Sequence, residues 1–252
     1  ANSSFVAMAS DPEVPADTLL RRPADIIGNA DNAAHPKIPL PHDLYQPERV
    51  NSRGIEFGER TALNQLVSSV AAESVSFAAV RITESMPEEV NRAVSAAREG
   101  FGSWSRTLAT IRASALDRAA NLLEQRMARF IALLQQEGGK TLDDSVSEVR
   151  EAADFCRYYA AEGRKLFGGA LLMPGPTGER NTLQLRGRGV FAAISPWNFP
   201  LAIFLGQVTA ALMAGNAVVA KPAEQTPRIA AEAVRLLHEA GIPKTVLHLM
   251  PG

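Results

Sequence analysis

Residues 189–224 read GVFAAISPWNFPLAIFLGQVTAALMAGNAVVAKPAE, and this stretch decides the fold. The apolar run Val190–Ile194 predicts a buried strand, and the turn 195–200, bracketed by two prolines, leads into an apolar helix over 200–214. Ala217–Ala220 predicts a second buried strand. Consecutive strands joined by a helix lie parallel, so the polar residues that follow them should meet at the carboxyl ends of the strands. Open parallel sheets bind their ligands at that edge.

The same unit occurs once more near the end of the chain. Thr226 and Pro227 cap and start a helix that runs to Ala240, and residues 246–250 form a third strand. Three parallel strands with two crossover helices make half of a doubly wound, Rossmann-type sheet, so the fold class is α/β. No helix follows the third strand before Gly252, and either another chain or a longer polypeptide is expected to complete the sheet. We favour the longer polypeptide.

Helices are expected ahead of this sheet. From about residue 61 apolar positions recur every three or four residues. Ser85 and Glu88 fit a capping box at the start of one helix. Thr141 fits the cap of another helix, which we expect to run to Gly163.

The remaining sequence suggests three segments. Residues 1–60 are rich in Pro, Asn and Asp, which predicts an extended arm or linker lying over other structure, with disorder as the alternative. Residues 61–180 are helical and end in a loop over 168–180. Residues 181–252 begin with a half-exposed strand over 181–188, suited to an assembly contact, and continue into the incomplete sheet.

Composition narrows the class of protein. The 252 residues are 46% hydrophobic and 21% charged, as in ordinary globular proteins. A formal net charge of −1 gives no support to a nucleic-acid partner. The single cysteine fits a reducing compartment, and no apolar run approaches the ~20 residues of a transmembrane segment. We therefore expect a cytoplasmic protein.

Several familiar motifs fail in context. Residues 187–192 fit the pattern G-x-G-x-x-A, but the glycines precede a strand instead of following one. Residues 139–141 resemble the end of a phosphate-binding loop, yet Leu134 stands where its first glycine is required. The four histidines have no ligand spacing, so no metal site is expected. Cys156 lies within a helix and is interpreted as a small buried apolar residue rather than a nucleophile.

The turn after the first strand carries the strongest chemical signal. Pro196 and Pro200 restrict the backbone, so the side chains between them are held in place. Asn198 offers an amide that can stabilise a developing oxyanion, or it is an ordinary helix N-cap. Trp197 is either core or the wall of a slot for a planar ring, and Phe199 either lines a substrate channel or simply packs.

A lysine and a glutamate follow the second strand. Lys221 is a hydrogen-bond donor and Glu224 an acceptor, a combination that suits the two hydroxyls of a ribose. The alternative is a surface ion pair beyond the strand. Two polar turns at neighbouring strand ends together favour a nucleotide site. Glu224 disfavours a 2′-phosphate on that ribose because a carboxylate repels it, although Lys221 beside it weakens that preference.

The segments Ile-Ser-Pro-Trp-Asn-Phe-Pro (194–200) and Lys-Pro-Ala-Glu (221–224) resemble the aldehyde dehydrogenase superfamily. Residues 85–252 are similar to the amino-terminal half of such an enzyme. The resemblance implies an aldehyde-dehydrogenase-like fold, NAD as the cofactor and Asn198 as a catalytic oxyanion-hole donor. The cofactor-binding residues that it implies are Ile194, Ser195, Pro196, Trp197, Lys221, Ala223 and Glu224.

A narrower resemblance concerns the segment that joins the two modules of the bifunctional bacterial proline-oxidising enzymes, the proline utilization A family. Residues 35–41, 44–45 and 48–52 are similar to it. This likeness implies oxidation of L-glutamate γ-semialdehyde (1-pyrroline-5-carboxylate) to L-glutamate in proline catabolism. Phe199 and Glu151 then face the aldehyde substrate, with a salt-bridged helix surface as the alternative for Glu151. FAD belongs only to the separate proline dehydrogenase module of that family.

The same resemblance places essential parts of the enzyme outside this chain. The nucleophilic cysteine, the general-base glutamate and the second glycine-rich turn are expected beyond Gly252. This chain alone should therefore be inactive, with the remainder of the dehydrogenase polypeptide as its partner and an oligomer as the parent assembly. Two other classes stay open, a non-catalytic NAD-binding module and an oligomerisation module.

Overall fold

The computed structural model describes residue 13, residues 15–20, residue 22, residues 38–74 and residues 82–252. The chain divides into two compact units, Ala1–Leu40 and Pro41–Gly252. In the first unit the described residues include one short helix, α2 (Ala16–Leu19). Much of the predicted arm before residue 38 lies outside the described residues.

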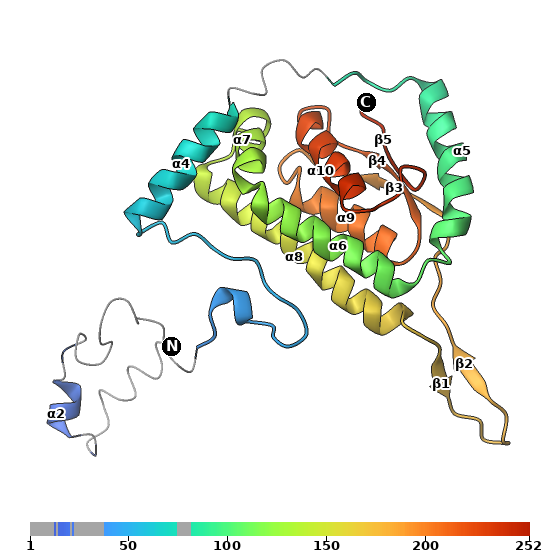
Figure 1. The fold of residues 1–252 in the computed structure, drawn as a ribbon, viewed down its shortest axis with the longest axis horizontal. Helices are drawn as coiled ribbons and strands as arrows, with labels where there is room; N and C mark the ends of the chain where they lie inside the picture. Colours follow the sequence, from blue (N-terminus) through green and yellow to red (C-terminus); the bar gives the residue numbers. More distant parts are fainter. Residues whose placement is uncertain (1–12, 14, 21, 23–37, 75–81) are drawn as a thin grey trace. The chain divides into compact units, whose positions relative to one another are not determined.

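Helices make up most of the second unit, and its strands all come after α8 in the chain (Figure 1). The helices are η2 (Pro41–Asp43, a 3₁₀ turn), α4 (Arg60–Ser74), α5 (Pro87–Trp104), α6 (Ala109–Gln125), α7 (Met127–Gly138), α8 (Leu142–Phe167), α9 (Ala202–Met213) and α10 (Pro227–Glu239). The strands are β1 (Leu171–Met173), β2 (Asn181–Leu183), β3 (Val190–Ile194), β4 (Ala217–Lys221) and β5 (Leu247–Leu249). Among the described residues, no helix is both long enough and apolar enough to cross a membrane.

The three-stranded sheet has the order β3–β4–β5, and both strand pairs are parallel. Val190 lies opposite Ala217, and Val218 lies opposite Leu247. Helix α9 connects β3 to β4, and α10 connects β4 to β5. The predicted α/β class, with two crossover helices and three parallel strands, is confirmed.

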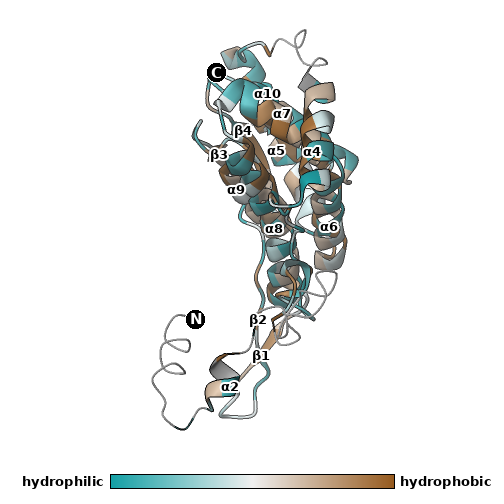
Figure 2. Ribbon diagram, turned by 90° about the vertical axis from the view of Figure 1, so that its left-hand side faces the viewer, coloured by the Kyte–Doolittle hydropathy of each residue, from teal (hydrophilic) through white to brown (hydrophobic). Residues whose placement is uncertain are grey.

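Helices cover both faces of this sheet. Helix α5 contacts all three strands, whereas α9 contacts β3 and β4, and α10 contacts β5. In Figure 1 the strands lie between α5 and the pair α9 and α10. Figure 2 shows hydrophobic residues concentrated in β4 and on the helix surfaces that surround it. Burying apolar side chains on both faces of a parallel sheet supplies the main stabilisation of such a layer.

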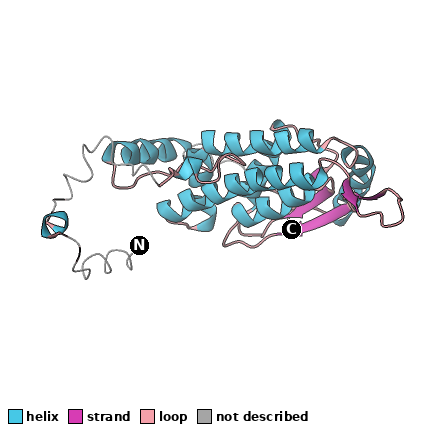
Figure 3. Ribbon diagram, turned by 90° about the horizontal axis from the view of Figure 1, so that it is seen from below, coloured by secondary structure: helices cyan, strands magenta, loops and turns pink. Residues whose placement is uncertain are grey.

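A second helical layer supports the first. Helices α6 and α8 pack along each other, and α8 also packs along α9. Figure 3 shows long helices lying side by side next to the strands. The largest fully buried side chains come from both layers: Phe130, Phe204, Leu116, Leu123, Ile131, Leu133, Leu134, Leu201, Leu205, Leu212, Ile229 and Leu236. The layers therefore share one continuous core, and α8 reaches from that core to the start of α9.

Helix α8 is longer than predicted. It begins after Thr141, whose side chain accepts a hydrogen bond from the Asp144 amide at 3.2 Å, as the sequence indicates. It continues through Gly163 to Phe167. A Cβ at Gly163 would lie 2.3 Å from the Met213 side chain, so this glycine allows α8 and α9 to approach closely instead of ending the helix.

The predicted loop over 168–180 is wrong in part, because β1 lies within it. β1 pairs antiparallel with β2, with Leu171 opposite Leu183. The predicted strand over 181–188 correspondingly ends at Leu183, and its three residues are all exposed instead of alternating between a buried and an exposed face. Three consecutive apolar residues show no alternation, and the glycines and prolines after them dominate the local pattern, so the first strand of this hairpin was missed.

The capping box of α5 is displaced by one residue. The helix is capped at Met86, whose amide donates to Glu89 Oε2 at 2.8 Å, in place of the predicted pair Ser85 and Glu88. The Ser85 amide instead donates to the Pro251 carbonyl at 2.6 Å. That bond ties the entry of α5 to the segment after β5, and this tertiary contact moves the cap.

Candidate functional site

The turns after β3 and β4 start at the same edge of the sheet. Ile194 is paired with Lys221 across the two strands, and the Ser195 amide donates to the Lys221 carbonyl at 3.2 Å. The predicted meeting of the two turns at the carboxyl ends of the strands therefore holds for their first residues. Ser195 itself is buried.

Asn198 lies in the middle of the first turn with an exposed side chain. Helix α9 begins at Ala202 with Leu201 as its N-cap, so the alternative of Asn198 as an N-cap is wrong. Within the described part of the chain its amide has no hydrogen-bond partner. Asn198 thus presents a free donor beside a helix start, which is the arrangement that an oxyanion-binding group needs.

The apolar side chains of this turn point outward. Ile194 is 66% exposed, Trp197 is 57% exposed and Phe199 is 40% exposed. The interpretation of Trp197 as a core residue is therefore wrong for this structure. Exposed large apolar side chains grouped in one turn are typical of a surface that contacts another molecule or another part of a protein. Their assignment to cofactor and substrate stays a prediction.

The second turn carries an ion pair. Lys221 Nζ lies 2.6 Å from Glu224 Oε1, and both side chains are accessible to solvent. The hydrogen bond from Lys221 lowers the pKa of the Glu224 carboxyl below its ordinary value. Ala223, which lies between them in the sequence, is buried. The pair offers an ammonium donor and a carboxylate acceptor next to each other, which matches the needs of a ribose diol.

Sequence reasoning missed two residues that hold the first turn. Glu148 of α8 is buried, and its Oε1 accepts hydrogen bonds from the amides of Leu201 at 2.8 Å and Ala202 at 3.1 Å. Its Oε2 lies 2.5 Å from Lys140 Nζ. The Lys140 ammonium also lies 4.1 Å from the centre of the Phe199 ring, within the range of a cation–π contact.

A signal for Glu148 was present in the sequence. The residue falls on the apolar face of α8, between Val146 and Val149, where a carboxylate is costly unless it is paired. That placement indicates a buried partner, but it does not say which one. The contact with α9 joins residues 53 and 54 positions apart, so no local pattern reveals it.

Glu151 lies one turn after Glu148 on α8. Burial raises the pKa of its carboxyl, the nearby Glu148 charge raises it further, and Lys140 lowers it. Glu151 has no ion pair within the described residues, so the alternative of a salt-bridged helix surface finds no partner there. Its approach to a substrate remains a prediction.

Cys156 is fully buried in α8. Burial raises the pKa of its thiol to about 12, well above that of a reactive cysteine. The interpretation as a buried apolar residue therefore agrees with its surroundings. Among the described residues, no group of three or more His, Cys, Asp or Glu side chains could hold a metal ion.

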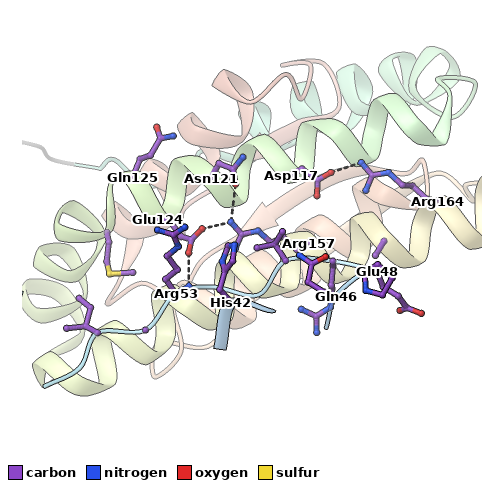
Figure 4. Close-up of a pocket in the computed structure, with 17 residues that line it drawn as sticks. His42, Gln46, Glu48, Arg53, Asp117, Asn121, Glu124, Gln125, Arg157 and Arg164 are labelled. Carbon is purple, nitrogen blue, oxygen red and sulfur yellow. Dashed lines mark hydrogen bonds and ion pairs between the residues drawn. The ribbon is translucent and has the colours of Figure 1, made fainter. Parts of the chain in front are cut away.

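A hollow away from these turns lies between residues 42–55 and helices α6 and α8 (Figure 4). Its charged groups bind one another: Arg157 bonds to Asn121 at 3.0 Å and to Glu124, and Glu124 also accepts from the Arg53 amide at 2.9 Å. These contacts fasten the segment before α4 to the helical layer. None of the predicted site residues lines this hollow.

Comparison with known proteins gives this geometry its context. Residues 70–252 match the model of the aldehyde dehydrogenase family. The chain belongs to this family. The predicted superfamily is thereby confirmed.

Named relatives narrow the comparison. The chain is 38% identical over 285 residues to the bifunctional protein PutA of Escherichia coli, covering all of this chain and 21% of that protein. It is 38% identical over 195 residues to a 1-pyrroline-5-carboxylate dehydrogenase of Geobacillus thermodenitrificans, covering 77% of this chain and 38% of that protein. The chain therefore spans about a fifth to two fifths of the length of these relatives.

Solved structures agree. A crystal structure of bifunctional proline utilization A (PutA) is 69% identical, with a TM-score of 0.83, over all of this chain and 25% of that one. A Thermus 1-pyrroline-5-carboxylate dehydrogenase with bound NAD is 27% identical, with a TM-score of 0.75, over 82% of this chain and 46% of that one. The predicted aldehyde-dehydrogenase-like fold and the likeness to the PutA and 1-pyrroline-5-carboxylate dehydrogenase region are confirmed.

Proposed function

We propose that this chain is part of an NAD-dependent aldehyde dehydrogenase that oxidises L-glutamate γ-semialdehyde to L-glutamate in proline catabolism. The observation that carries the proposal is the free Asn198 amide on a turn that begins beside Lys221. One neighbouring turn then serves the reacting carbonyl and the other serves the dinucleotide. The substrate follows from the names of the relatives, bifunctional PutA and 1-pyrroline-5-carboxylate dehydrogenase.

Asn198 stabilises charge in the proposed reaction. Attack of a thiolate on the aldehyde places negative charge on the former carbonyl oxygen, and the side-chain NH2 of Asn198 donates a hydrogen bond to it. A positioned donor of this kind contributes most where water is excluded. The exposed Phe199 ring forms one wall of the aldehyde site, and Glu151 approaches the amino end of the substrate.

The two turns also divide the cofactor between them. Lys221, Ala223 and Glu224 would hold the adenosine ribose, while residues 194–197 would border the nicotinamide end. Bound NAD accepts the hydride in aldehyde oxidation. The support for this assignment is the chemistry of the 2.6 Å ammonium–carboxylate pair and its place one strand from Ser195. A NAD-bound Thermus relative of the same fold adds to it.

Other parts of the enzyme are proposed to lie in a longer polypeptide. The only cysteine of this chain is buried and has a raised pKa, so a different cysteine must act as the nucleophile. The general base and the second glycine-rich turn belong to that same remainder. The proposed parent assembly is an oligomer in the cytoplasm, and FAD belongs only to its proline dehydrogenase module.

Steady-state NADH formation from glutamate semialdehyde by the full-length enzyme tests the proposal. We expect Asn198→Ala to lower kcat by roughly 10²- to 10³-fold, as removal of an oxyanion donor does elsewhere. Asn91→Ala is the matched control, because Asn91 is an exposed amide on α5. An inactive wild-type enzyme, or equal effects of the two substitutions, would contradict the proposal.

A second expectation concerns the 252-residue polypeptide by itself. We predict no NADH formation from glutamate semialdehyde, because the chain offers no accessible thiolate. The measurement is the absorbance of NADH at high protein concentration, with the full-length enzyme as positive control. Reproducible turnover by the isolated chain would show that the chemistry does not need a cysteine from elsewhere.

A further inference from the structure

The turn that carries Asn198 is fastened at both ends. At its start, the Ser195 amide bonds to the Lys221 carbonyl in the neighbouring strand at 3.2 Å. At its end, the amides of Leu201 and Ala202 bond to one oxygen of Glu148. Asn198 lies between these two anchors, in a backbone that two prolines already restrict. The backbone position of Asn198 therefore depends on where Glu148 holds the start of α9.

The carboxylate of Glu148 is itself held in place. Its side chain is 1% exposed, and the Lys140 ammonium, 12% exposed, lies 2.5 Å from its second oxygen. The Lys140 ammonium also contacts the ring of Phe199, the residue next to Asn198, at 4.1 Å from the ring centre. Residues from two positions in the chain, the loop before α8 and the first turns of α8, thus converge on one turn.

The sign of the electrostatics excludes a direct role for Glu148 in charge stabilisation. A carboxylate at the N-terminus of α9 occupies the positive end of the helix dipole and disfavours a second negative charge nearby. Lys140 offsets that charge. Glu148 consequently cannot help an oxyanion by its own field, and its contribution must come through geometry.

We propose that Glu148, supported by Lys140, is a positioning residue that aims the Asn198 amide at the reacting carbonyl. This inference rests on the proposed function. It adds a specific dependence: Asn198 acts at full strength only while the Glu148 carboxylate bonds to Leu201 and Ala202. Neither Glu148 nor Lys140 needs to touch the substrate.

Glu148→Gln breaks this arrangement with almost no change of shape. Two backbone amides donate to one oxygen of the carboxylate, and the Lys140 ammonium is paired with the other oxygen. Glutamine replaces one of these acceptor oxygens by an NH2 donor. Whichever way the new side chain turns, one donor faces another donor. Removing charge alone would favour an oxyanion, whereas loss of positioning lowers kcat. The direction of the change in kcat therefore separates the two effects.

The experiment is a double-mutant cycle in the full-length enzyme, using Glu148→Gln, Asn198→Ala and the combination. We expect Glu148→Gln to lower kcat by roughly 10- to 100-fold, with the KM for NAD within about twofold of wild type, by analogy with other orienting residues. In the Asn198→Ala background, Glu148→Gln should lower kcat by less than about threefold, because residues that act as one unit are not additive.

Glu137→Gln is the matched control. Glu137 is a buried carboxylate that accepts from the amides of Arg228 at 3.0 Å and Ile229 at 2.9 Å, so it caps α10 in the way that Glu148 caps α9. Its effect should multiply with that of Asn198→Ala, because it holds the other crossover helix. If Glu148→Gln fails to fold, Lys140→Gln replaces it in the cycle, with the same expected non-additivity.

The outcomes separate the two proposals. An active wild-type enzyme in which the losses of Glu148→Gln and Asn198→Ala multiply would overturn the positioning role and leave the proposed function standing. A rise in kcat for Glu148→Gln would overturn it equally. A wild-type enzyme that does not oxidise the semialdehyde would overturn the proposed function and the positioning role together.

Discussion

At the scale of single residues, burial excludes the Cys156 thiol as the nucleophile. Its thiol is fully buried and its pKa is raised to about 12, so almost no thiolate forms near neutral pH. We expect Ellman's reagent at pH 8 to leave the native chain unmodified and to label one thiol after unfolding in urea. Rapid stoichiometric labelling of the native chain would contradict the burial of Cys156.

Asn198 and Glu148 mark what the sequence could and could not reveal about the site. The proline-bracketed turn identified Asn198, Trp197 and Phe199 as candidates, because a restricted turn at a strand end is a local feature. Glu148 acts through contacts with residues more than 50 positions away. Only the folded chain brings its carboxylate to the start of α9. Lys140 was not identified either, because only the folded chain places its ammonium beside both the Glu148 carboxylate and the Phe199 ring.

At the scale of elements, the contact between α5 and the segment before β5 requires a residue without a side chain at Gly100. A Cβ at Gly100 would lie 2.3 Å from the Thr245 carbonyl oxygen, which belongs to the backbone and cannot turn aside. We expect Gly100→Ala to lower the free energy of unfolding by roughly 1–3 kcal/mol, as overpacking does. Urea unfolding followed by circular dichroism measures this change.

Gly102→Ala is the control on the same helix. Its Cβ would approach only the Arg106 guanidinium, at 3.9 Å. Alanine favours helix over glycine, so this substitution should be neutral or should stabilise by up to about 1 kcal/mol. Equal destabilisation by the two substitutions would show that helix α5 does not approach Thr245 as described.

Elements with a clear pattern of apolar residues could be predicted from the sequence, whereas elements whose bounds depend on tertiary contacts could not. β3 was predicted at its observed bounds because Val190–Ile194 is an apolar run closed by turn residues. Its predicted burial is wrong, because Ala193 alone of these five residues is buried and Phe191 and Ile194 are exposed. α8 extends past its predicted end because Gly163 allows close packing against Met213 and does not end the helix. β1 was missed because its three residues pair only with β2 and show no alternation of their own.

At the scale of the whole molecule, an ionic cluster links α7 to α10. Glu232 Oε1 lies 2.6 Å from Arg129 Nε and 2.5 Å from Arg235 Nη2. Burial alone would raise the pKa of Glu232, but hydrogen bonds from Arg235 and Arg129 outweigh it and lower the pKa below 4.5. The folded state therefore favours the ionised carboxylate of Glu232. The stabilisation that this carboxylate gives the fold is fully present above its ordinary pKa and is lost as the pH falls through the lowered pKa of the folded state.

This sign gives a prediction for Glu232→Gln. At pH 7 we expect the substitution to lower the free energy of unfolding by roughly 1–3 kcal/mol, since it weakens hydrogen bonds to charged groups. The difference in the free energy of unfolding between wild type and Glu232→Gln should become smaller as the pH falls below 4.5. Glu99→Gln, an exposed position on α5, is the control with little change at either pH. A gap that widens in acid would contradict the assignment.

The two turns at the end of β3 and β4 account for function only if they share one dinucleotide. A crystal structure of the full-length enzyme with NAD measures this most directly. We predict the adenosine ribose in contact with Lys221 and Glu224, and the nicotinamide end against residues 194–197, on the side of the turn that carries Asn198. A dinucleotide that avoids Lys221 and Glu224, or that leaves the Asn198 turn uncovered, would contradict the account.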